Sequence, residues 1–273
     1  MPKKIRGYHS QCPFEIRMFK ENKAISTGTA FFFECSGEIF LITNWHNLSG
    51  RNAFTKQPLS KIPDNFPTHI EAGLSSYGHG KVQLPSGHFT TIFRKIDIYG
   101  ATDNGLEPLW YEHPQLGSTC DIAALRLGKP PDVPTFMHNP ANTLSSLDIP
   151  IKPGGVAFII GFPSSLSVGF GLPIWKSGFI ASEPTYDVCI GGDFSPVGGM
   201  AGGIEIPAFF IDSQTRSGMS GSPVFASFTG NWSISNPYEE IDPNGDNFWN
   251  RKDIALHHTA SGVAPISTGH PSN

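Results

Sequence analysis

Charged residues are scarce in this chain. They make up 15% of its 273 residues, well below the roughly 25% that is typical of globular proteins. No stretch of the sequence reaches the about 18 consecutive apolar residues that a membrane-spanning helix needs, so we expect no membrane partner. Apolar residues are also not spaced at 3.6 positions over any sustained length, which excludes a fold built on long amphipathic helices.

An excess of positive charge is absent too. A net charge of −4 gives no reason to expect a nucleic-acid partner. The basic residues near the start (Lys3, Lys4 and Arg6) are followed by no apolar core and no small-residue cleavage site, so they do not form a secretion signal. The four cysteines are scattered and include no Cys-x-x-Cys pair. Without an export signal, reduced thiols are favoured over disulfides, and we expect a cytoplasmic protein.

Signals for a cofactor or a metal are weak. The glycine-rich segment 191–203 lacks the framing of a phosphate-binding loop, and we interpret it as a hairpin. The acidic turn 242–247 has a misplaced glycine and lacks the final glutamate of a calcium-binding loop. His257 and His258 are adjacent, so on a strand their side chains would point to opposite faces. We therefore expect neither a cofactor nor a metal.

Turn-forming residues, in contrast, are abundant: the chain contains 30 glycines and 24 prolines. Such a composition is typical of many short strands joined by tight turns. The strand-like runs form two groups, which predict an N-terminal unit over 1–128, a linker over 129–153 and a C-terminal unit over 154–273. The runs are 14–19, 24–34, 38–43, 88–99 and 121–127, then 155–162, 174–182, 186–190, 205–212 and 222–228, with a last strand expected within 254–266.

Three short motifs point to chemistry, and the most specific surrounds Ser220. This serine stands between Gly218 and Gly221 and is followed by Ser-Pro-Val. A glycine two positions before the serine lets the backbone bend, so that the amides of Gly218 and Ser220 point at one oxyanion. Gly221 leaves room for a substrate backbone to pass close to the serine.

The other two motifs lie upstream. His46 follows the apolar run 40–43, and Asp121 stands at the head of an apolar strand. Each residue alone is more often structural, as a core histidine or a strand-start cap. Asp97 is a competing acid, but it lies in mid-strand between basic and aromatic residues, which makes Asp121 the better candidate. The order His, Asp, Ser distinguishes the chymotrypsin arrangement from those of subtilisin and the α/β-hydrolases.

On these three motifs, the chain resembles the trypsin-like (chymotrypsin-fold) serine peptidases, especially their intracellular bacterial members without zymogen processing. The resemblance runs from about residue 14 to 226. It implies an all-β fold of two six-stranded antiparallel β-barrels with the active site in the cleft between them. It also implies a catalytic triad of His46, Asp121 and Ser220, and an oxyanion hole made by the amides of Gly218 and Ser220.

The same resemblance bears on specificity and activation. Alignment to the nucleophile places the floor of the substrate pocket at Gln214 and Thr215, which are neutral and therefore predict uncharged side chains before the scissile bond. Met219 stands where zymogen-activated relatives carry an acid, so activation by a newly cut N-terminus is not expected. The implied function is a serine endopeptidase that acts on proteins or peptides through an acyl-enzyme. The alternatives are an esterase with the same triad, and a non-catalytic barrel that acts as a binding or regulatory module.

Overall fold

A computed structural model describes residues 7–77, 89–103, 105–129, 138–144, 151–169, 171–191, 193–195, 199–227 and 263–265, and the structural statements below refer to these residues. Strands dominate them. Helical structure is limited to one five-residue α-helix, α1 (Trp45–Ser49), and four short 3-10 helices, η1 (Tyr8–Gln11), η2 (Ser118–Cys120), η3 (Ala141–Thr143) and η4 (Pro163–Ser165). No helix in this part of the chain is long and apolar enough to cross a membrane.

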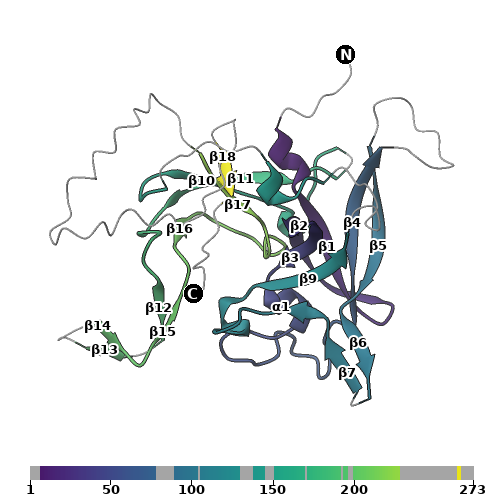
Figure 1. Cartoon of the computed structure of the whole chain (residues 1–273), viewed down its shortest axis with the longest axis horizontal. Coiled ribbons are helices and arrows are strands. Elements are labelled where there is room, and N and C mark those ends of the chain that lie inside the picture. Colours follow the sequence, from purple (N-terminus) through teal and green to yellow (C-terminus); the bar gives the residue numbers. More distant parts are fainter. Residues whose placement is uncertain are drawn as a thin grey trace.

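The larger sheet has seven strands and is built from the first half of the chain (Figure 1). Its strand order is β5-β4-β1-β2-β3-β9-β8, and every pairing is antiparallel. The strands are β1 (Pro13–Lys20), β2 (Lys23–Cys35), β3 (Glu38–Thr43), β4 (His69–Tyr77), β5 (Phe89–Asp97), β8 (Trp110–Tyr111) and β9 (Ala123–Gly128), and a separate hairpin joins β6 (Tyr99–Thr102) to β7 (Gly105–Pro108).

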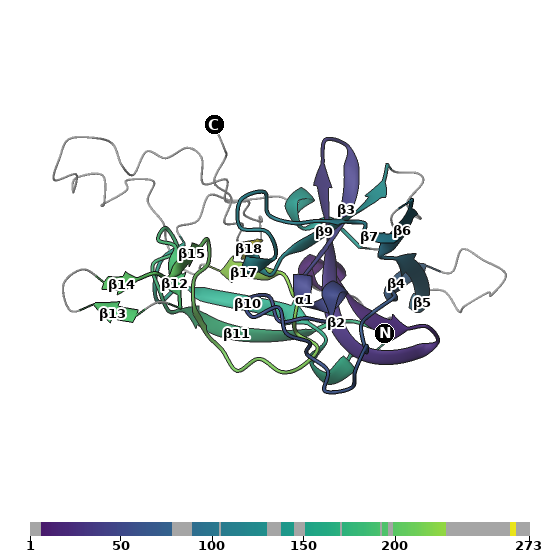
Figure 2. The same cartoon turned by 90° about the horizontal axis from the view of Figure 1, so that it is seen from below.

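The smaller sheet has five strands in the order β16-β11-β10-β17-β18, again antiparallel. These are β10 (Val156–Gly161), β11 (Ile174–Ile180), β16 (Ile211–Asp212), β17 (Val224–Ser227) and β18 (Val263–Pro265). Two short antiparallel pairs form an arm that projects from this sheet in both views (Figures 1 and 2). The arm consists of β12 (Val188–Ile190), β13 (Asp193–Ser195), β14 (Gly199–Ala201) and β15 (Ile204–Ile206), which agrees with the hairpin expected over 191–203.

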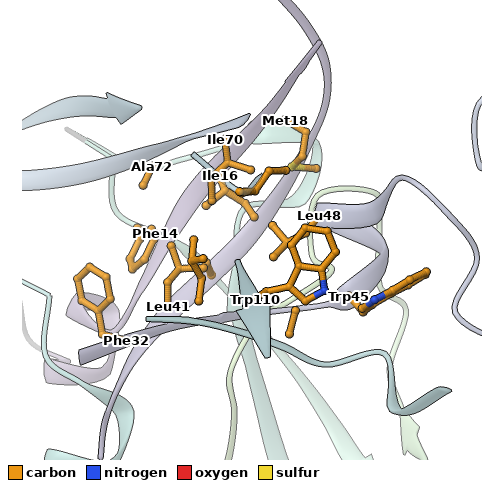
Figure 3. Close-up of a cluster of buried hydrophobic side chains, with 14 of the residues drawn as sticks. Phe14, Ile16, Met18, Phe32, Leu41, Trp45, Leu48, Ile70, Ala72 and Trp110 are labelled. Carbon is orange, nitrogen blue, oxygen red and sulfur yellow. The ribbon is translucent and has the colours of Figure 1, made fainter. Parts of the chain in front are cut away.

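The core of the larger sheet follows from alternation along its strands. On β1, Phe14, Ile16 and Met18 are buried at 0%, 0% and 1% exposure, as the two-residue period of a strand requires. Leu41 on β3 and Ile70 on β4 pack into the same cluster (Figure 3). Burying such side chains contributes about 1.5–3 kcal/mol each, so this cluster provides a rigid platform for the segments at the strand ends.

The predicted all-β character agrees with this mostly β, antiparallel structure. The division into two six-stranded barrels stays a prediction, because the sheets contain seven and five strands and no pairing among the described residues joins the outer strands of either sheet. Of the last strand expected within 254–266, residues 263–265 form β18, while 254–262 and 266 lie outside the described residues.

Strand β4 was not predicted. Its buried apolar side chains, those of Ile70, Ala72 and Leu74, do alternate, but Gly73 interrupts the run with a residue that strands disfavour. Gly73 pairs with Phe93 across the sheet, and a Cβ atom at position 73 would lie 3.0 Å from the Phe93 ring. The ring therefore occupies the space of the missing side chain, a long-range compensation that the local sequence does not reveal.

Candidate active site

Helix α1 presents His46 at the end of strand β3. Its neighbours Trp45 and Leu48 are buried at 7% and 0% exposure and pack into the core of the larger sheet (Figure 3). Gly50 caps the C-terminal end of the helix: it has a φ of +68° and donates its N–H to the carbonyl of His46 at 3.0 Å. A Cβ atom at Gly50 would lie 2.8 Å from the Pro67 ring. The sequence thus limits the helix to little more than one turn and holds His46 in place.

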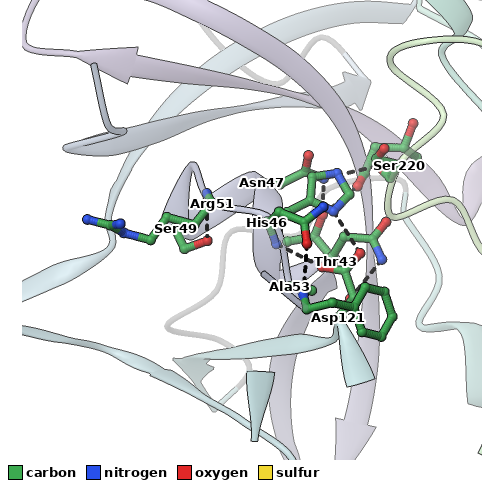
Figure 4. A network of polar contacts seen from close by, with 12 residues as sticks. Thr43, His46, Asn47, Ser49, Arg51, Ala53, Asp121 and Ser220 are labelled. Atoms are coloured by element: carbon green, nitrogen blue, oxygen red, sulfur yellow. Dashed lines mark hydrogen bonds and ion pairs between the residues drawn. The ribbon is translucent and has the colours of Figure 1, made fainter. Parts of the chain in front are cut away.

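Asp121 is bound to the segment that carries His46 through four hydrogen bonds (Figure 4). Its Oδ2 atom lies 2.7 Å from His46 Nδ1, and its Oδ1 atom accepts the His46 backbone N–H at 2.9 Å. Its backbone carbonyl accepts Trp45 N at 3.1 Å and Asn44 Nδ2 at 2.7 Å. The carboxylate therefore fixes both the position of the histidine and the direction in which its ring points.

This geometry also sets the tautomer of His46. A carboxylate oxygen beside Nδ1 favours a proton on that nitrogen, which leaves Nε2 as the free acceptor of the ring. The two side chains are about one-quarter exposed, at 26% for His46 and 25% for Asp121. The competing acid, Asp97, instead forms an exposed ion pair with Lys95 at 3.4 Å. The structure thus brings Asp121, and not Asp97, to His46.

A second carboxylate supports α1 from the side, and the sequence analysis did not single it out. Glu112 Oε1 accepts the indole N–H groups of both Trp45 at 2.7 Å and Trp110 at 3.2 Å. Lys56 Nζ lies 5.2 Å from the centre of the Trp45 ring, within the range of a cation–π contact. Glu112 therefore links helix α1 to strand β8. Strand β8 pairs with β9, and Asp121 lies just before β9.

The loop of Ser220 consists of two consecutive turns. Met219 N donates to Arg216 O at 3.1 Å, and Ser222 N donates to Met219 O at 3.0 Å. The third residue of each turn is a glycine, Gly218 with a φ of +90° and Gly221 with a φ of +86°. A positive φ at the third position is what a type II turn requires. The spacing of the two glycines thus specifies the double turn that displays Ser220.

The two glycines are also required by close packing. A Cβ atom at Gly218 would lie 2.4 Å from the carbonyl oxygen of Phe162, and one at Gly221 would lie 2.1 Å from that of Thr29. Both contacts are with backbone atoms, which cannot move aside as a flexible side chain can. This loop is therefore pressed against the strands on both sides of it.

The amides expected to form the oxyanion hole are those of Gly218 and Ser220. Within the described part of the chain, the N–H groups of Gly218 and Ser220 have no hydrogen-bond partner. The carbonyl of Ser217 accepts Ser164 N at 2.6 Å. Because a trans peptide directs its C=O and N–H to opposite sides, this bond turns the Gly218 N–H away from Ser164. Ser164 itself has a φ of +51°, an uncommon value for a serine.

The carbonyl of Ser220 connects the two sheets. It accepts Thr29 N from strand β2 at 2.8 Å and Asn47 Nδ2 from helix α1 at 3.1 Å (Figure 4). Asn47 Nδ2 also donates to Thr43 Oγ1 at 2.9 Å. A Cβ atom at Gly28 would lie 2.7 Å from that nitrogen, so the glycine leaves space for Asn47. Ser220 is in this way held next to the helix that carries His46.

Ser220 Oγ makes no hydrogen bond to the imidazole of His46 in this structure, although both residues are described. Hydrogen bonds between a nucleophile and its base are often long in a free enzyme and tighten when substrate binds. What the structure establishes is the His46–Asp121 pair, and the attachment of the Ser220 backbone to the residue after His46.

The predicted pocket residues, Gln214 and Thr215, are exposed, as are the next two residues of the chain. The alignment did not predict the cation beside them: Lys176 on strand β11 donates from Nζ to the backbone carbonyl of Gln214. A positive charge beside Gln214 would repel a basic side chain placed next to it.

Cysteine thiols are the other nucleophiles near the site. All four cysteines are free. Burial, and to a smaller extent the Asp187 carboxylate, raises the pKa of the Cys120 thiol beside Asp121, so that thiol does not compete as a thiolate. Among the described residues, no group of three or more His, Cys, Asp or Glu side chains is arranged to hold a metal ion.

The three residues of the candidate triad carry signals in the sequence, whereas the residues that hold them carry little or none, chiefly Thr29, Asn47, Glu112 and Ser164. Asn47 has a weak signal, because it directly follows His46. Gly28, which leaves space for the Asn47 side chain, is also visible as a glycine within a strand. Thr29 and Ser164 have no such signal, because their partners are distant in sequence. Glu112 bonds Trp110 two positions before it, but its bond to Trp45 spans 67 positions and leaves no local signal.

No protein-family model matches the chain, and no curated protein matches it. Several similar solved structures are serine proteases. The Rv3671c protease of M. tuberculosis in its active form is 14% identical over 94% of this chain and 76% of its own, with a TM-score of 0.40. The HtrA-type protease AlgW with a tripeptide is 15% identical over 79% of this chain and 47% of its own, with a TM-score of 0.38. A serine endoprotease from Yersinia pestis is 13% identical over 81% and 54%, with a TM-score of 0.36. Because these sequence identities and TM-scores are low, the function proposed below rests on the geometry of the site alone.

Proposed function

We propose that this protein is a serine endopeptidase that hydrolyses peptide bonds through an acyl-enzyme on Ser220. The observation that carries the proposal is the 2.7 Å contact between His46 Nδ1 and Asp121 Oδ2, which leaves Nε2 of the ring free as a base. The free amides of Gly218 and Ser220 add a place for negative charge next to the serine.

In the first half of the reaction, His46 Nε2 takes the proton of Ser220 Oγ while that oxygen attacks the carbonyl carbon of the scissile bond. Asp121 stabilises the imidazolium that results and keeps the ring in one orientation. The amides of Gly218 and Ser220 donate to the oxyanion of the tetrahedral intermediate. His46 then gives its proton to the leaving amine, and the acyl group remains on Ser220.

In the second half, water takes the place of the amine. His46 removes a proton from the water as it attacks the acyl carbon, and returns that proton to Ser220 Oγ when the acid leaves. No cofactor is needed in either half, since a base, a nucleophile and two hydrogen-bond donors supply every step.

The wider organisation is part of the same proposal. We place the catalytic cleft between an N-terminal unit over 1–128 and a C-terminal unit over 154–273, each a six-stranded barrel, joined by the linker 129–153. The hydrogen bonds from Thr29 and Asn47 to the Ser220 carbonyl support a site shared by the two units. We further propose that the enzyme acts on proteins or peptides in the cytoplasm, where its free cysteines would stay reduced.

The second candidate is a non-catalytic module that binds a partner through the same cleft. One observation favours it: Ser220 Oγ has no hydrogen bond to His46. An esterase with the same triad would share every step above and differ only in substrate. Turnover of a peptide distinguishes the proposed endopeptidase from a non-catalytic module. A comparison of the rates on peptide and ester substrates distinguishes it from an esterase.

The direct test is labelling by a fluorophosphonate, which reacts with activated serines. Wild-type protein should be labelled at Ser220, and Ser220→Ala should lose both the labelling and the cleavage of a peptide library. Ser222→Ala is a matched control, since its Oγ atom is buried and has no hydrogen-bond partner among the described residues. Labelling of wild type at another serine, or none at all, would rule out the proposed nucleophile.

A further inference from the structure

Thr29 is a buried residue of strand β2 that contacts three parts of the candidate site. It has 0% exposure. Its backbone N–H donates to Ser220 O at 2.8 Å, and its carbonyl accepts Thr43 Oγ1 at 2.8 Å. Its hydroxyl donates to Gly218 O at 2.8 Å and accepts Phe162 N at 3.2 Å. Every hydrogen-bonding group of this threonine is therefore engaged.

These bonds act on the turn that carries the two free amides. The peptide between Gly218 and Met219 is held on one side by the Thr29 hydroxyl and on the other by the bond from Met219 N to Arg216 O. The carbonyl of Ser220, two residues after Gly218, accepts Thr29 N. One residue of the opposite sheet thus fixes the carbonyls of both residues whose amides are free.

The hydroxyl matters because Gly218 is the most permissive point of the turn. A glycine rotates readily between backbone conformations, and only the correct rotation directs its N–H to the same point as that of Ser220. The bond from Ser164 N to the Ser217 carbonyl holds the peptide before Gly218, and the bond from the Thr29 hydroxyl holds the peptide after it, so the two bonds together restrain that rotation. The second of these bonds comes from a residue whose own position is fixed by the core of the larger sheet.

We propose that Thr29 is a positioning residue, whose hydroxyl keeps the amides of Gly218 and Ser220 directed at the substrate oxyanion. This inference rests on the proposed function of Ser220. Thr29 lies 189 positions from Gly218 in the sequence. It would thus contribute to binding of the transition state without touching the substrate. A purely structural role would instead reduce stability and leave the chemical step of folded protein unchanged.

The first variant is Thr29→Val, which replaces the hydroxyl with a methyl group of similar shape, and Thr29→Ser restores the hydroxyl. The measured quantities are the two constants of fluorophosphonate labelling, the affinity KI and the maximal rate kinact, at a temperature where all variants are folded. Loss of one oxyanion donor reduces the rate of the chemical step by about 100–1,000-fold. For misdirected amides we expect kinact of Thr29→Val to fall by about 10–100-fold, with KI within about threefold and Thr29→Ser close to wild type.

Thr43→Val is the matched control, because it removes a buried threonine hydroxyl of the same network that contacts no carbonyl of the turn. Its kinact should fall much less than that of Thr29→Val. If Thr29→Val does not fold, Thr29→Ala compared with Thr29→Ser isolates the same hydroxyl.

An unchanged kinact in Thr29→Val, or an equal loss in Thr43→Val, would overturn the assignment while leaving the proposed function standing. Wild-type protein that is not labelled at Ser220 would instead overturn the proposed function, and the role of Thr29 with it.

Discussion

His138 links the stability of this protein to mildly acidic pH. Its Nε2 atom accepts Ser75 N at 2.9 Å, and its ring packs edge-on against Phe14 at 5.1 Å between centroids. Its Nδ1 atom is buried and has no hydrogen-bond partner among the described residues. Burial lowers the pKa of His138 from 6.5 to about 4. The nearby Gln11 carbonyl opposes this shift, but it already accepts Asn139 N at 3.0 Å.

The sign and size of the effect follow from this shift. The unfolded chain binds a proton at His138 near pH 6.5, whereas the folded protein resists protonation until about pH 4. The stabilising contribution is therefore complete above pH 6.5 and is lost as the pH falls toward 4. A shift of this size corresponds to about 3 kcal/mol in total, with a slope of up to about 1.4 kcal/mol per pH unit. That amount is a large fraction of the about 5–15 kcal/mol that stabilises a typical domain.

The test compares wild type with His138→Gln, which retains an acceptor for Ser75 N but does not titrate. The free energy of unfolding, measured in urea at about pH 7, 5.5 and 4.5, should be similar for the two proteins at pH 7 and should fall more steeply for wild type below it. Carboxylates titrate equally in both proteins, so the difference between the two curves isolates His138. Parallel curves over this range would show that the histidine is not buried in its neutral form.

Two further predictions concern the nucleophile loop and the pocket. Gly221→Ala should lower the free energy of unfolding by about 3–5 kcal/mol, because it adds backbone strain to a collision with the Thr29 carbonyl. The control is Gly37→Ala, at a position with a φ of +75° and open space around it, and this variant should lose only about 1–2 kcal/mol. Equal losses in the two variants would mean that position 221 is not closely packed. The 273-residue chain, without cleavage near residue 1, should cut peptides after uncharged residues. Met219 offers no partner for a new N-terminus, and Lys176 lies beside Gln214. Profiling against a peptide library checks this, and preferred cleavage after Arg or Lys, or activity only after trimming, would contradict it.

Several parts of this structure could be predicted from the sequence because their signals are local. Strands β1 and β3 show alternating burial, and Gly218 and Gly221 mark turns that need positive φ. The pairing of His46 with Asp121 was implied by the family resemblance that the three ordered motifs carry, and the two side chains lie 2.7 Å apart.

The supporting contacts could not be predicted, because each depends on two segments that meet only after folding. The Thr29 hydroxyl bonds Gly218 in the loop between β16 and β17, and a threonine in a strand carries no sign of such a partner. Ser164 adopts a positive φ without being glycine or asparagine, so no local rule marks its turn. The ring of Phe93 over Gly73 likewise joins two strands whose pairing the sequence did not predict.

The backbone at Asp121 limits the chemistry of that position as much as its charge does. With a φ of +52°, it lies in the left-handed region, which aspartate, asparagine and glycine enter more readily than other residues. Glutamate would keep the negative charge, but it enters the left-handed region less readily and is one methylene too long for the two bonds to His46. Both the backbone and these bonds therefore favour the shorter of the two acidic residues here. Main-chain geometry therefore limits which residues position 121 tolerates, independently of the chemical role proposed for its side chain.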